Sequence, residues 1–382
     1  MIISRTPYRI SFFGGGTDYP VWFREHGGAV LSTSIQHYCY ITGRFLPPFF
    51  EHRSRVVWSQ IEQVMNNGEI NHPVVRAVLE FLGISKGIEI HHAGDLPARS
   101  GLGSSSAFTV GILHVLHSLQ ERLVTRERLA EEAIFVEQEL LGESVGVQDQ
   151  IQTAFGGFNR IDIQQNGTFN VVPLPISRDR LKALEGRLLL FFTGIVRYAS
   201  AVADSKIKAI PNKVQEMTGL RSFVDEGTAI LTGNGNLDDF GRLLHESWML
   251  KRSLSSAVAP PFVDEIYARA RAAGAIGGKL LGAGGGGFML FFTPEGGQAA
   301  VRKALNELIE VPVIFDRSGS QIIFYSQPAF LPESLQRRDF RQFSAADWVD
   351  LSGEEGGSEQ ALSGRDGMAA SPMEQGPAWK LK

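Results

Sequence analysis

The segment LPARSGLGSSSAF, residues 96–108, constrains what this chain can fold into more than any other stretch. Gly101 and Gly103 free the backbone to approach a ligand, and three serines then open a stretch with helical periodicity over residues 104–119. The free amides and the positive dipole end of a helix start suit an anion, above all phosphate. A plain N-capped helix after a turn is the alternative, because serine is common at that position. No Walker loop of the form GxxxxGK[ST] occurs in the sequence.

Two further glycine-bearing segments surround this one in the sequence. In GGKLLGAGGGGFMLFF, residues 277–292, Gly282–Gly287 matches GxGxxG, but an apolar strand follows where a dinucleotide fold needs a helix. A dinucleotide-dependent oxidoreductase is therefore disfavoured, and we expect a loop that lets two backbones or a ligand approach closely. FFGGGTDYP, residues 12–20, follows a strand expected over 7–13 and could, by itself, be merely a turn.

The rest of the chain mixes strands and helices without strict alternation, which predicts an α+β protein with two lobes meeting near 180–190. Strands are predicted from β-branched and aromatic runs and from the Asn166-Gly167 turn signal, at 29–46 (one or two strands), 87–91, 153–175 (a hairpin), 188–194, 288–293 and 311–326. Helices are predicted from the helical period at 72–82, 104–119, 125–141, around 200–217, 222–233, 237–252, 261–273 and 297–308.

The composition is that of a soluble globular protein, with 43% hydrophobic and 20% charged residues among 382. A net charge of −4 argues against a general nucleic-acid binder, and the single cysteine excludes an internal disulfide and fits a reducing cytosol. We expect no leader and no membrane span, because no apolar run is long enough, and therefore a cytoplasmic protein. Beyond about residue 330 the core pattern fades, so 331–382 is predicted to be a tail, largely disordered from about 352.

In this order, the three segments resemble the motifs of the galactokinase, homoserine kinase, mevalonate kinase and phosphomevalonate kinase (GHMP) superfamily. TPYRISFFGGGTDY resembles the APGRxNLxGEHTDY start of the galactokinase branch, PARSGLGSSSA the PxGxGLGSSAA phosphate loop, and KLLGAGGGG the K-x-T/S-G-A-G-x-G-G segment. The resemblance covers about residues 1–330. Within the superfamily, the chain is similar to the bacterial D-glycero-D-manno-heptose 7-phosphate kinase group, through RTPYRISFFGGGTDYP, HGGAVLSTSI, GLGSSSAFTVG, GESVGVQDQIQTAFGGFN and FFTGIVRYAS.

The resemblance implies an α+β, two-lobed GHMP kinase fold. A ribosomal-protein-like N-terminal lobe, residues 1–185, would carry the ATP loop and the catalytic aspartate, and a ferredoxin-like C-terminal lobe would span 186–330. The implied enzyme is an ATP-dependent phosphotransferase with an alcohol acceptor, with ATP and Mg²⁺ as cofactors. Its partners would be small-molecule substrates, with neither nucleic acid nor membrane, and a homodimer is compatible with the family.

The family pattern also assigns the nucleotide and metal residues. Ser105 takes the place of the magnesium-binding serine and Glu137 that of the acidic metal ligand, with Glu139 as the second candidate. Ile134, Glu137 and Leu141 form one line on the predicted helix, so Glu137 borders the buried side, although a solvated glutamate is the alternative. The histidines lack a third ligand nearby in sequence, so we expect no zinc site. The loop expected to wrap the ATP phosphates consists of Arg99, Ser100, Gly101, Leu102, Gly103, Ser104, Ser105 and Ser106.

Asp149, in GVQDQIQTAFGG, matches the family's catalytic aspartate. Its carboxylate would accept the proton of the acceptor hydroxyl, or merely orient that hydroxyl. Arg9 matches the arginine of the PGR motif and would balance the charge that develops there. Without the resemblance, Arg9 could equally be a surface residue of a strand.

Asp18 matches the TDY aspartate that hydrogen-bonds sugar hydroxyls in the galactokinase branch. This chain has Gly15-Gly16 where galactokinases have Glu-His, which removes two sugar-contacting side chains, argues against galactose and permits a bulkier or phosphorylated sugar. A 7-phosphate would need cations, for which Arg197 and Lys251-Arg252 are candidates, against ordinary surface charges. The full set expected to bind substrate is Gly15, Gly16, Thr17, Asp18, Arg197, Lys251, Gly284 and Gly285.

The leading hypothesis is a kinase that phosphorylates the anomeric hydroxyl of D-glycero-D-manno-heptose 7-phosphate to the 1,7-bisphosphate, for nucleotide-activated heptose synthesis. One alternative is a fucokinase- or galactokinase-like kinase of a free sugar. Another is a catalytically silent sensor that binds sugar and ATP, and the intact set of Arg9, Ser105, Glu137 and Asp149 argues against it.

Overall fold

A computed structural model describes residues 1–47, 49–195, 207–255 and 258–326. The described residues belong to one compact unit. The predicted tail lies outside the described residues, as does the first part, 200–206, of the helix predicted around 200–217. Its described part contains a 3₁₀ turn at Ile210–Asn212 and the start of the next helix at Val214.

The larger of two sheets has nine strands, in the order β13-β1-β2-β5-β3-β4, with β6 and β12 also paired to β2 and β7 paired to β6. All its pairings are antiparallel except that of β3 with β5, which is parallel. The segment predicted as one or two strands is a single strand of 18 residues, β2. The strands are β1 (Ile2–Phe13), β2 (Gly28–Phe45), β3 (Ser54–Val57), β4 (Ile61–Val64), β5 (Ile88–Gly94), β6 (Phe158–Ile163), β7 (Phe169–Pro173), β12 (Phe315–Asp316) and β13 (Gln321–Tyr325).

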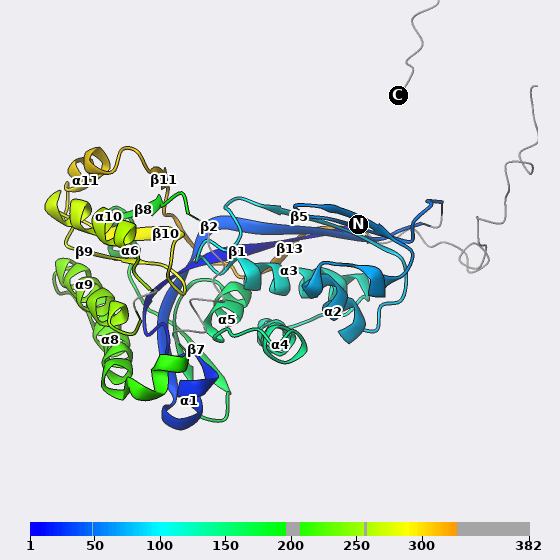
Figure 1. Ribbon diagram of the computed structural model, residues 1–382, viewed down its shortest axis with the longest axis horizontal. Helices are drawn as coiled ribbons and strands as arrows, with labels where there is room; N and C mark the ends of the chain where they lie inside the picture. The colour runs from blue at the N-terminus through cyan, green and yellow to red at the C-terminus, as the bar shows by residue number, and fades with distance from the viewer. Residues whose placement is uncertain (48, 196–206, 256–257, 327–382) are drawn as a thin grey trace, which may run out of the picture. The chain divides into compact units, whose positions relative to one another are not determined.

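Helices α2, α3, α4 and α5 lie on one face of this sheet (Figure 1). The central helix, α3, packs on β1 and β2, and Gly111 allows the close contact, since a Cβ there would lie 3.1 Å from Thr6 Oγ1. Apolar residues on both flanks of α3 are buried, so it belongs to the core rather than to the surface. The bounds in this half are α1 (Pro20–His26), a 3₁₀ turn (Asn67–Glu69), α2 (Pro73–Phe81), α3 (Ser104–Leu119), α4 (Arg126–Phe135), a π-helical turn (Val136–Leu140), α5 (Gln148–Phe155) and α6 (Arg178–Glu185).

The smaller sheet has four antiparallel strands in the order β11-β8-β10-β9. All five residues of β10 are buried, which explains its continuous apolar sequence, and α9 packs against β9. The bounds here are β8 (Leu188–Phe192), a 3₁₀ turn (Ile210–Asn212), α8 (Val214–Thr232), α9 (Asp238–Arg252), α10 (Pro261–Ala272), β9 (Gly277–Leu280), β10 (Phe288–Phe292), α11 (Gln298–Ala304) and β11 (Ile309–Val311).

Three predicted elements differ from the structure. The hairpin predicted from residue 153 starts only at Phe158, because α5 continues to Phe155. The polar side chains of Gln150 and Gln152 are buried in α5, which hid its helical period. The helix predicted over 125–141 changes to a π-helical turn at Val136, and the helix predicted to start at residue 222 belongs to the longer α8.

The change from the larger to the smaller sheet falls between β7 and β8, near the predicted lobe boundary at residue 185. The chain then returns to the larger sheet through β12 and β13, which pair with β2 and β1. The division into lobes at residue 185 therefore stays a prediction, and residues 315–325 belong to the larger sheet.

Candidate active site

A buried arginine and a carboxylate form the centre of the site. Arg9 lies on β1 with 4% of its side chain exposed, and Asp149 is the second residue of α5, with 29% exposed. Arg9 Nε and Nη2 donate to Asp149 Oδ1 and Oδ2 at 2.7 Å each, which is the bidentate geometry of a strong charge-assisted pair. Ser11 Oγ donates to Gln148 Oε1 at 2.8 Å and so fixes the start of α5 against the same strand.

The same arginine binds the predicted phosphate loop, residues 99–106. Arg9 Nη1 donates to the carbonyl oxygen of Gly101 at 2.6 Å, and its backbone N–H donates to the carbonyl oxygen of Leu102 at 3.0 Å. A Cβ on Gly103 would lie 3.1 Å from Arg9 Cγ and 3.5 Å from the carboxylate of Asp149. Gly101 and Gly103 have φ values of 85° and 73°, where a side chain would be strained. Both glycines are thus needed for the loop to reach the Arg9–Asp149 pair.

Helix α3 begins at this loop without a side-chain cap. Its N-cap residue is Gly103, and no described side chain accepts from the amides of its first turn. Ser104 Oγ instead accepts from the backbone N–H of Arg99, which closes the loop, and Ser105 is exposed. The free amides at the N-terminus of a helix of 16 residues favour an anion at this position.

Glu137 lies in the π-helical turn and is fully buried. Its Oε2 accepts from Ser106 Oγ at 3.0 Å and from Gln150 Nε2 at 2.5 Å, whereas its Oε1 is buried and has no hydrogen-bond partner among the described residues. Burial raises the pKa of Glu137 to about 7, and the hydrogen bonds from Gln150 and Ser106 only partly oppose this.

The serine that contacts Glu137 is Ser106, one residue beyond the predicted Ser105. Ser105 points away from the core on the first turn of α3, and the second acidic candidate, Glu139, is exposed. The assignment of Ser105 to a metal stays a prediction, whereas Ser106 is the hydroxyl that the fold holds beside the carboxylate.

The segment predicted to face the sugar, residues 14–18, lies against the turn before α5. Asp18 is buried, its Oδ1 accepts from the backbone N–H of Gly16 at 2.8 Å, and its carbonyl oxygen accepts from Val147 N at 3.1 Å. A Cβ on Gly146 would lie 1.9 Å from Asp18 Oδ2, so the carboxylate abuts the turn that leads to Asp149. Thr17, also predicted to bind substrate, is fully buried, and its hydroxyl lies 2.8 Å from the carbonyl oxygens of Gly14 and Ala29.

The distal glycine segment, residues 277–287, packs directly against the phosphate loop. A Cβ on Gly101 would lie 2.5 Å from the carbonyl oxygen of Leu281, and one on Gly287 would lie 2.2 Å from that of Ser100. This is the close approach of two backbones that the sequence predicts. Gly284 and Gly285 lie in the same segment, where Gly285 N donates to the carbonyl oxygen of Val258 at 3.2 Å. Nothing places Arg197, because it lies outside the described residues.

Lys251, predicted to bind a substrate phosphate, is buried in the last turn of α9. Its Nζ donates to the carbonyl oxygen of Gly282 at 2.7 Å and lies 3.3 Å from that of Leu280. Lys279 is also buried, and its Nζ donates to the carbonyl oxygen of Phe12 at 2.6 Å, just before the segment predicted to face the sugar. Arg252, the other predicted cation, forms an ion pair with Asp264 at 2.8 Å.

An aromatic cluster near the start of α3 is absent from the sequence-based predictions. The rings of His72 and Phe108 stack with centroids 4.7 Å apart, and Trp58 and His92 contact this pair edge-on at 4.9 and 5.1 Å. Burial lowers the pKa of His72 to about 4 and also lowers that of His92, so both rings are neutral at pH 7. Phe108 follows Ser104 by one helical turn, which places a neutral aromatic surface beside the phosphate loop.

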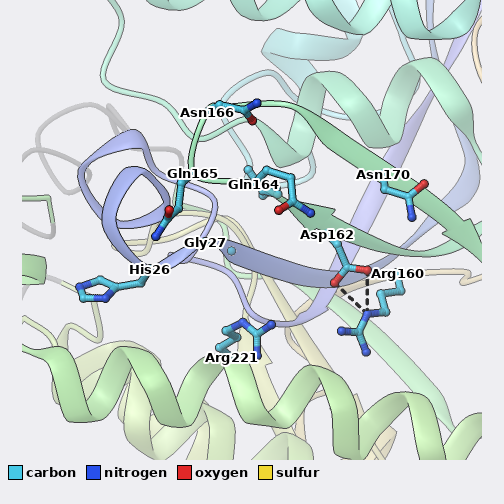
Figure 2. A pocket seen from close by; sticks show the side chains of 11 residues that line it. His26, Gly27, Arg160, Asp162, Gln164, Gln165, Asn166, Asn170 and Arg221 are labelled. Atoms are coloured by element: carbon cyan, nitrogen blue, oxygen red, sulfur yellow. Dashed lines mark hydrogen bonds and ion pairs between the residues drawn. The ribbon is translucent and has the colours of Figure 1, made fainter.

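A polar pocket of about 700 Å³ lies between the β6–β7 hairpin, the end of α1 and α8 (Figure 2). Figure 2 shows Arg160 bound to Asp162 among the residues that line this pocket, and Arg160 also pairs with Asp225 at 2.6 Å. None of the predicted site residues lines it. Its other arginine, Arg221, also lies near Asp225, at 3.9 Å. Both arginines are therefore paired with carboxylates, so the pocket does not replace the Arg9–Asp149 centre as the candidate active site.

Comparison with known proteins agrees with this geometry. Residues 70–157 match the family model of the GHMP kinases N-terminal domain, and residues 228–310 match that of the GHMP kinases C-terminal domain. The chain therefore belongs to the GHMP kinases, with their α+β fold, and is an ATP-dependent phosphotransferase.

Within this family, the chain is similar to heptose phosphate kinases. It is 28% identical over 317 residues to the D-glycero-alpha-D-manno-heptose 7-phosphate kinase of Campylobacter jejuni, covering 80% of this chain and 93% of the relative. It is 25% identical to a solved structure described as a D-glycero-D-manno-heptose 1-phosphate kinase from Bacteroides thetaiotaomicron, with a TM-score of 0.71 and coverage of 85% and 100%.

A bifunctional fucokinase/GDP-fucose pyrophosphorylase of Arabidopsis thaliana is also 28% identical, over 81% of this chain and 31% of the relative. None of the helices in the described parts of the chain is both long and apolar enough to cross a membrane.

Proposed function

We propose that this chain transfers the γ-phosphoryl group of ATP to the anomeric hydroxyl of D-glycero-D-manno-heptose 7-phosphate, giving the 1,7-bisphosphate and ADP. The observation that carries the proposal is the bidentate Arg9–Asp149 pair, which is hydrogen-bonded to the phosphate loop through Gly101. Such a pair places a carboxylate for an acceptor hydroxyl beside a loop suited to phosphate. The similarity to two heptose phosphate kinases supports the choice of sugar.

Asp149 is assigned the role of binding the acceptor hydroxyl of the sugar. Each of its oxygens receives one hydrogen bond from Arg9, and each carboxylate oxygen can accept more than one. The exposed part of the Asp149 side chain then takes the proton of the sugar hydroxyl, or orients that hydroxyl. The oxygen of the sugar hydroxyl attacks the γ-phosphorus, and ADP leaves. The Arg9 guanidinium offsets the negative charge that gathers between the carboxylate and the transferred group.

The nucleotide is assigned to the phosphate loop and the aromatic cluster. The backbone amides of residues 99–106 and the free first turn of α3 bind the phosphates. The half-buried neutral rings of Trp58, His72 and His92 provide a stacking surface for the purine base. Aromatic side chains can stack on any base, because every base has a π-face. The adjoining start of α3 brings base and phosphates into one continuous site.

The residues around Glu137 fit a magnesium ion. Its Oε1 is a buried carboxylate oxygen without a hydrogen-bond partner in the described structure, and a serine hydroxyl lies beside its other oxygen. Mg²⁺ is usually held by one or two carboxylates together with substrate phosphates, so one buried carboxylate beside a hydroxyl can be the contribution of the protein. We assign the ion to Glu137 with a serine of the phosphate loop, Ser105 or Ser106. Bound Mg²⁺ would neutralise charge on the β- and γ-phosphates.

The sugar is assigned to residues 14–18 and the distal glycine segment. Asp18 contributes a carboxylate next to the turn that leads to Asp149, and Gly15 and Gly16 stand where galactokinases have Glu-His. Arg197 stays a predicted contact for the 7-phosphate. The names of the two relatives place the existing phosphate of the sugar at different carbons, so the position that this chain phosphorylates is the central question for experiment.

The test measures ADP formation with D-glycero-D-manno-heptose 7-phosphate, unphosphorylated heptose, fucose, galactose and mevalonate. A phosphorus spectrum of the product then identifies the new phosphate by its coupling to the anomeric proton. Turnover of the heptose 7-phosphate to a 1,7-bisphosphate is expected. Turnover of unphosphorylated sugars alone would favour a fucokinase- or galactokinase-like enzyme, and ATP binding without any turnover would favour the sensor.

A further inference from the structure

We propose that Lys251 is a positioning residue, which holds the phosphate loop against the Arg9–Asp149 pair, and not a contact for the phosphate of the substrate. Its side chain leaves the last turn of α9 and is 5% exposed. Its ammonium group bonds the carbonyl oxygen of Gly282 at 2.7 Å and lies 3.3 Å from that of Leu280. The charge is therefore directed at the backbone of the distal glycine segment.

The bonded segment touches the phosphate loop without an intervening side chain. A Cβ on Gly282 would lie 2.5 Å from Gly101 Cα, and one on Gly101 would lie 2.5 Å from the carbonyl oxygen of Leu281. The carbonyl oxygen of Gly101 in turn accepts from Arg9 Nη1 at 2.6 Å. A continuous path thus runs from Lys251 through Gly282, Gly101 and Arg9 to Asp149.

The distal glycine segment holds its position only if its backbone is restrained, because glycine has more conformational freedom than any other residue. Five of the six residues of Gly282–Gly287 are glycines, and Gly282 has a φ of 73°. An ammonium group that bonds a carbonyl at one end of the turn and approaches a second limits that freedom, and hydrogen bonds to charged groups are stronger than neutral ones. A displacement of about 1 Å in a reacting group can lower the rate about 100-fold, so this restraint bears on catalysis as well as on stability.

The two roles for Lys251 predict different kinetics. A phosphate contact would raise KM for a phosphorylated sugar and abolish the preference for it over the unphosphorylated sugar. A positioning residue would lower kcat for both sugars alike and weaken nucleotide binding. The inference rests on the kinase activity of the chain and not on the identity of its sugar.

The experiment compares wild type with Lys251→Met, Lys251→Arg and the exposed control Lys303→Met. It measures kcat and KM for ATP, kcat/KM for heptose 7-phosphate and for unphosphorylated heptose, and the affinity for a non-hydrolysable ATP analogue. For Lys251→Met we expect kcat to fall about 10- to 100-fold and the affinity for the analogue to fall about 10-fold, with the ratio of kcat/KM for the two sugars unchanged. Lys251→Arg, which keeps the charge, should recover part of kcat, and Lys303→Met should match wild type.

A rise in KM confined to heptose 7-phosphate, with normal analogue binding, would overturn the proposal in favour of a phosphate contact. Unchanged kinetics of Lys251→Met would also overturn it. If that variant does not fold, Gly282→Ala disturbs the same contact with the lysine intact, and a normal kcat would then refute the path. If wild type turns over neither heptose, the proposed substrate is wrong, but the analogue affinity of the variants still decides the role of Lys251.

Discussion

Replacing Glu137 by glutamine should change how the stability of this protein depends on pH. The carboxyl group is fully buried, and burial, helped by the nearby negative charge of Glu143, raises its pKa from the ordinary 4.5 to about 7. Below pH 4.5 the group is protonated in both the native and the unfolded protein. Between pH 4.5 and 7 the unfolded chain releases this proton while the native protein retains it, so the free energy of unfolding falls as the pH rises.

The difference between the two pKa values corresponds to about 3 kcal/mol, which is the destabilisation expected once the pH exceeds 7. Glutamine has nearly the same shape and cannot ionise, so Glu137→Gln removes this term. The absolute stability of the variant also depends on which hydrogen bonds the new amide forms with Ser106 and Gln150. The informative quantity is therefore how the difference in free energy of unfolding between variant and wild type changes with pH. Relative to wild type, the variant should gain roughly 2–3 kcal/mol between pH 5 and 8.

Urea unfolding of both proteins at pH 5, 6, 7 and 8, with a chelator present, measures this difference. The control is Glu139→Gln at an exposed glutamate two residues away, which removes a carboxyl group of the same segment and leaves the buried one in place. Addition of Mg²⁺ and an ATP analogue at pH 8 should stabilise wild type more than Glu137→Gln, because only the ionised carboxylate attracts the cation. A stability difference between Glu137→Gln and wild type that is the same at every pH would refute the reasoning.

Three further substitutions test single parts of the site. Asp149→Asn should lower kcat by about 10²- to 10⁴-fold, and it should also lower Tm, since buried Arg9 loses its charged partner. Steady-state kinetics measure the first effect and calorimetry the second, and an unchanged kcat would contradict the role of Asp149. Gly146→Ala should displace Asp18 and raise KM for the sugar about 10-fold or more without altering the affinity for an ATP analogue, and an unchanged sugar KM would remove Asp18 from the substrate site. Trp58→Ala should raise KM for ATP roughly 5- to 100-fold with the sugar KM unchanged, as loss of one stacking contact predicts, and normal ATP kinetics would show that the base binds elsewhere.

The centre of the site was accessible from the sequence through its motifs and not through local patterns. Arg9 and Asp149 are 140 residues apart, and the resemblance to a kinase family assigned both of them to catalysis. The helix that carries Asp149 was not predicted, because Gln152 fills a core position: its side chain bonds Ser32 and Ser34 of β2. A hydrophobic period cannot reveal a helix face that is buried through polar contacts.

The choice between Ser105 and Ser106 shows a second limit. The helical period over 104–119 predicts one buried face for α3, but the helix is buried on a second side as well. Ser106 and Val110 lie in the core on that side, and Ser106 reaches Glu137. Which of three adjacent serines faces a carboxylate 31 residues later depends on how α3 packs against the π-helical turn, and that packing is a tertiary property. The burial of Lys251 is likewise a tertiary property. A lysine in the last turn of a helix is usually exposed at the surface, where its charge interacts favourably with the helix dipole.

The aromatic cluster comes from four separate segments, and only their tertiary arrangement brings it together. One local signal was present, since Pro73 at the first position of α2 predicts a helix start and His72 caps it. That signal accounts for the place of His72 in the chain. It says nothing of Trp58 or Phe108.

The strand that carries Arg9 depends on a segment near the end of the described chain. β1 lies between β2 and β13, and the N-terminal ammonium group of Met1 donates to the carbonyl oxygen of Ser326 at 2.8 Å. During synthesis, only α1 separates β2 from β1, whereas β13 begins more than 300 residues after β1 ends. Until then one edge of β1 presents unpaired amides and carbonyls, which is the kind of edge that invites pairing with other chains. Translation products that stop before residue 321 would therefore contain every side chain assigned to phosphoryl transfer, yet the strand bearing Arg9 would be paired on one side only.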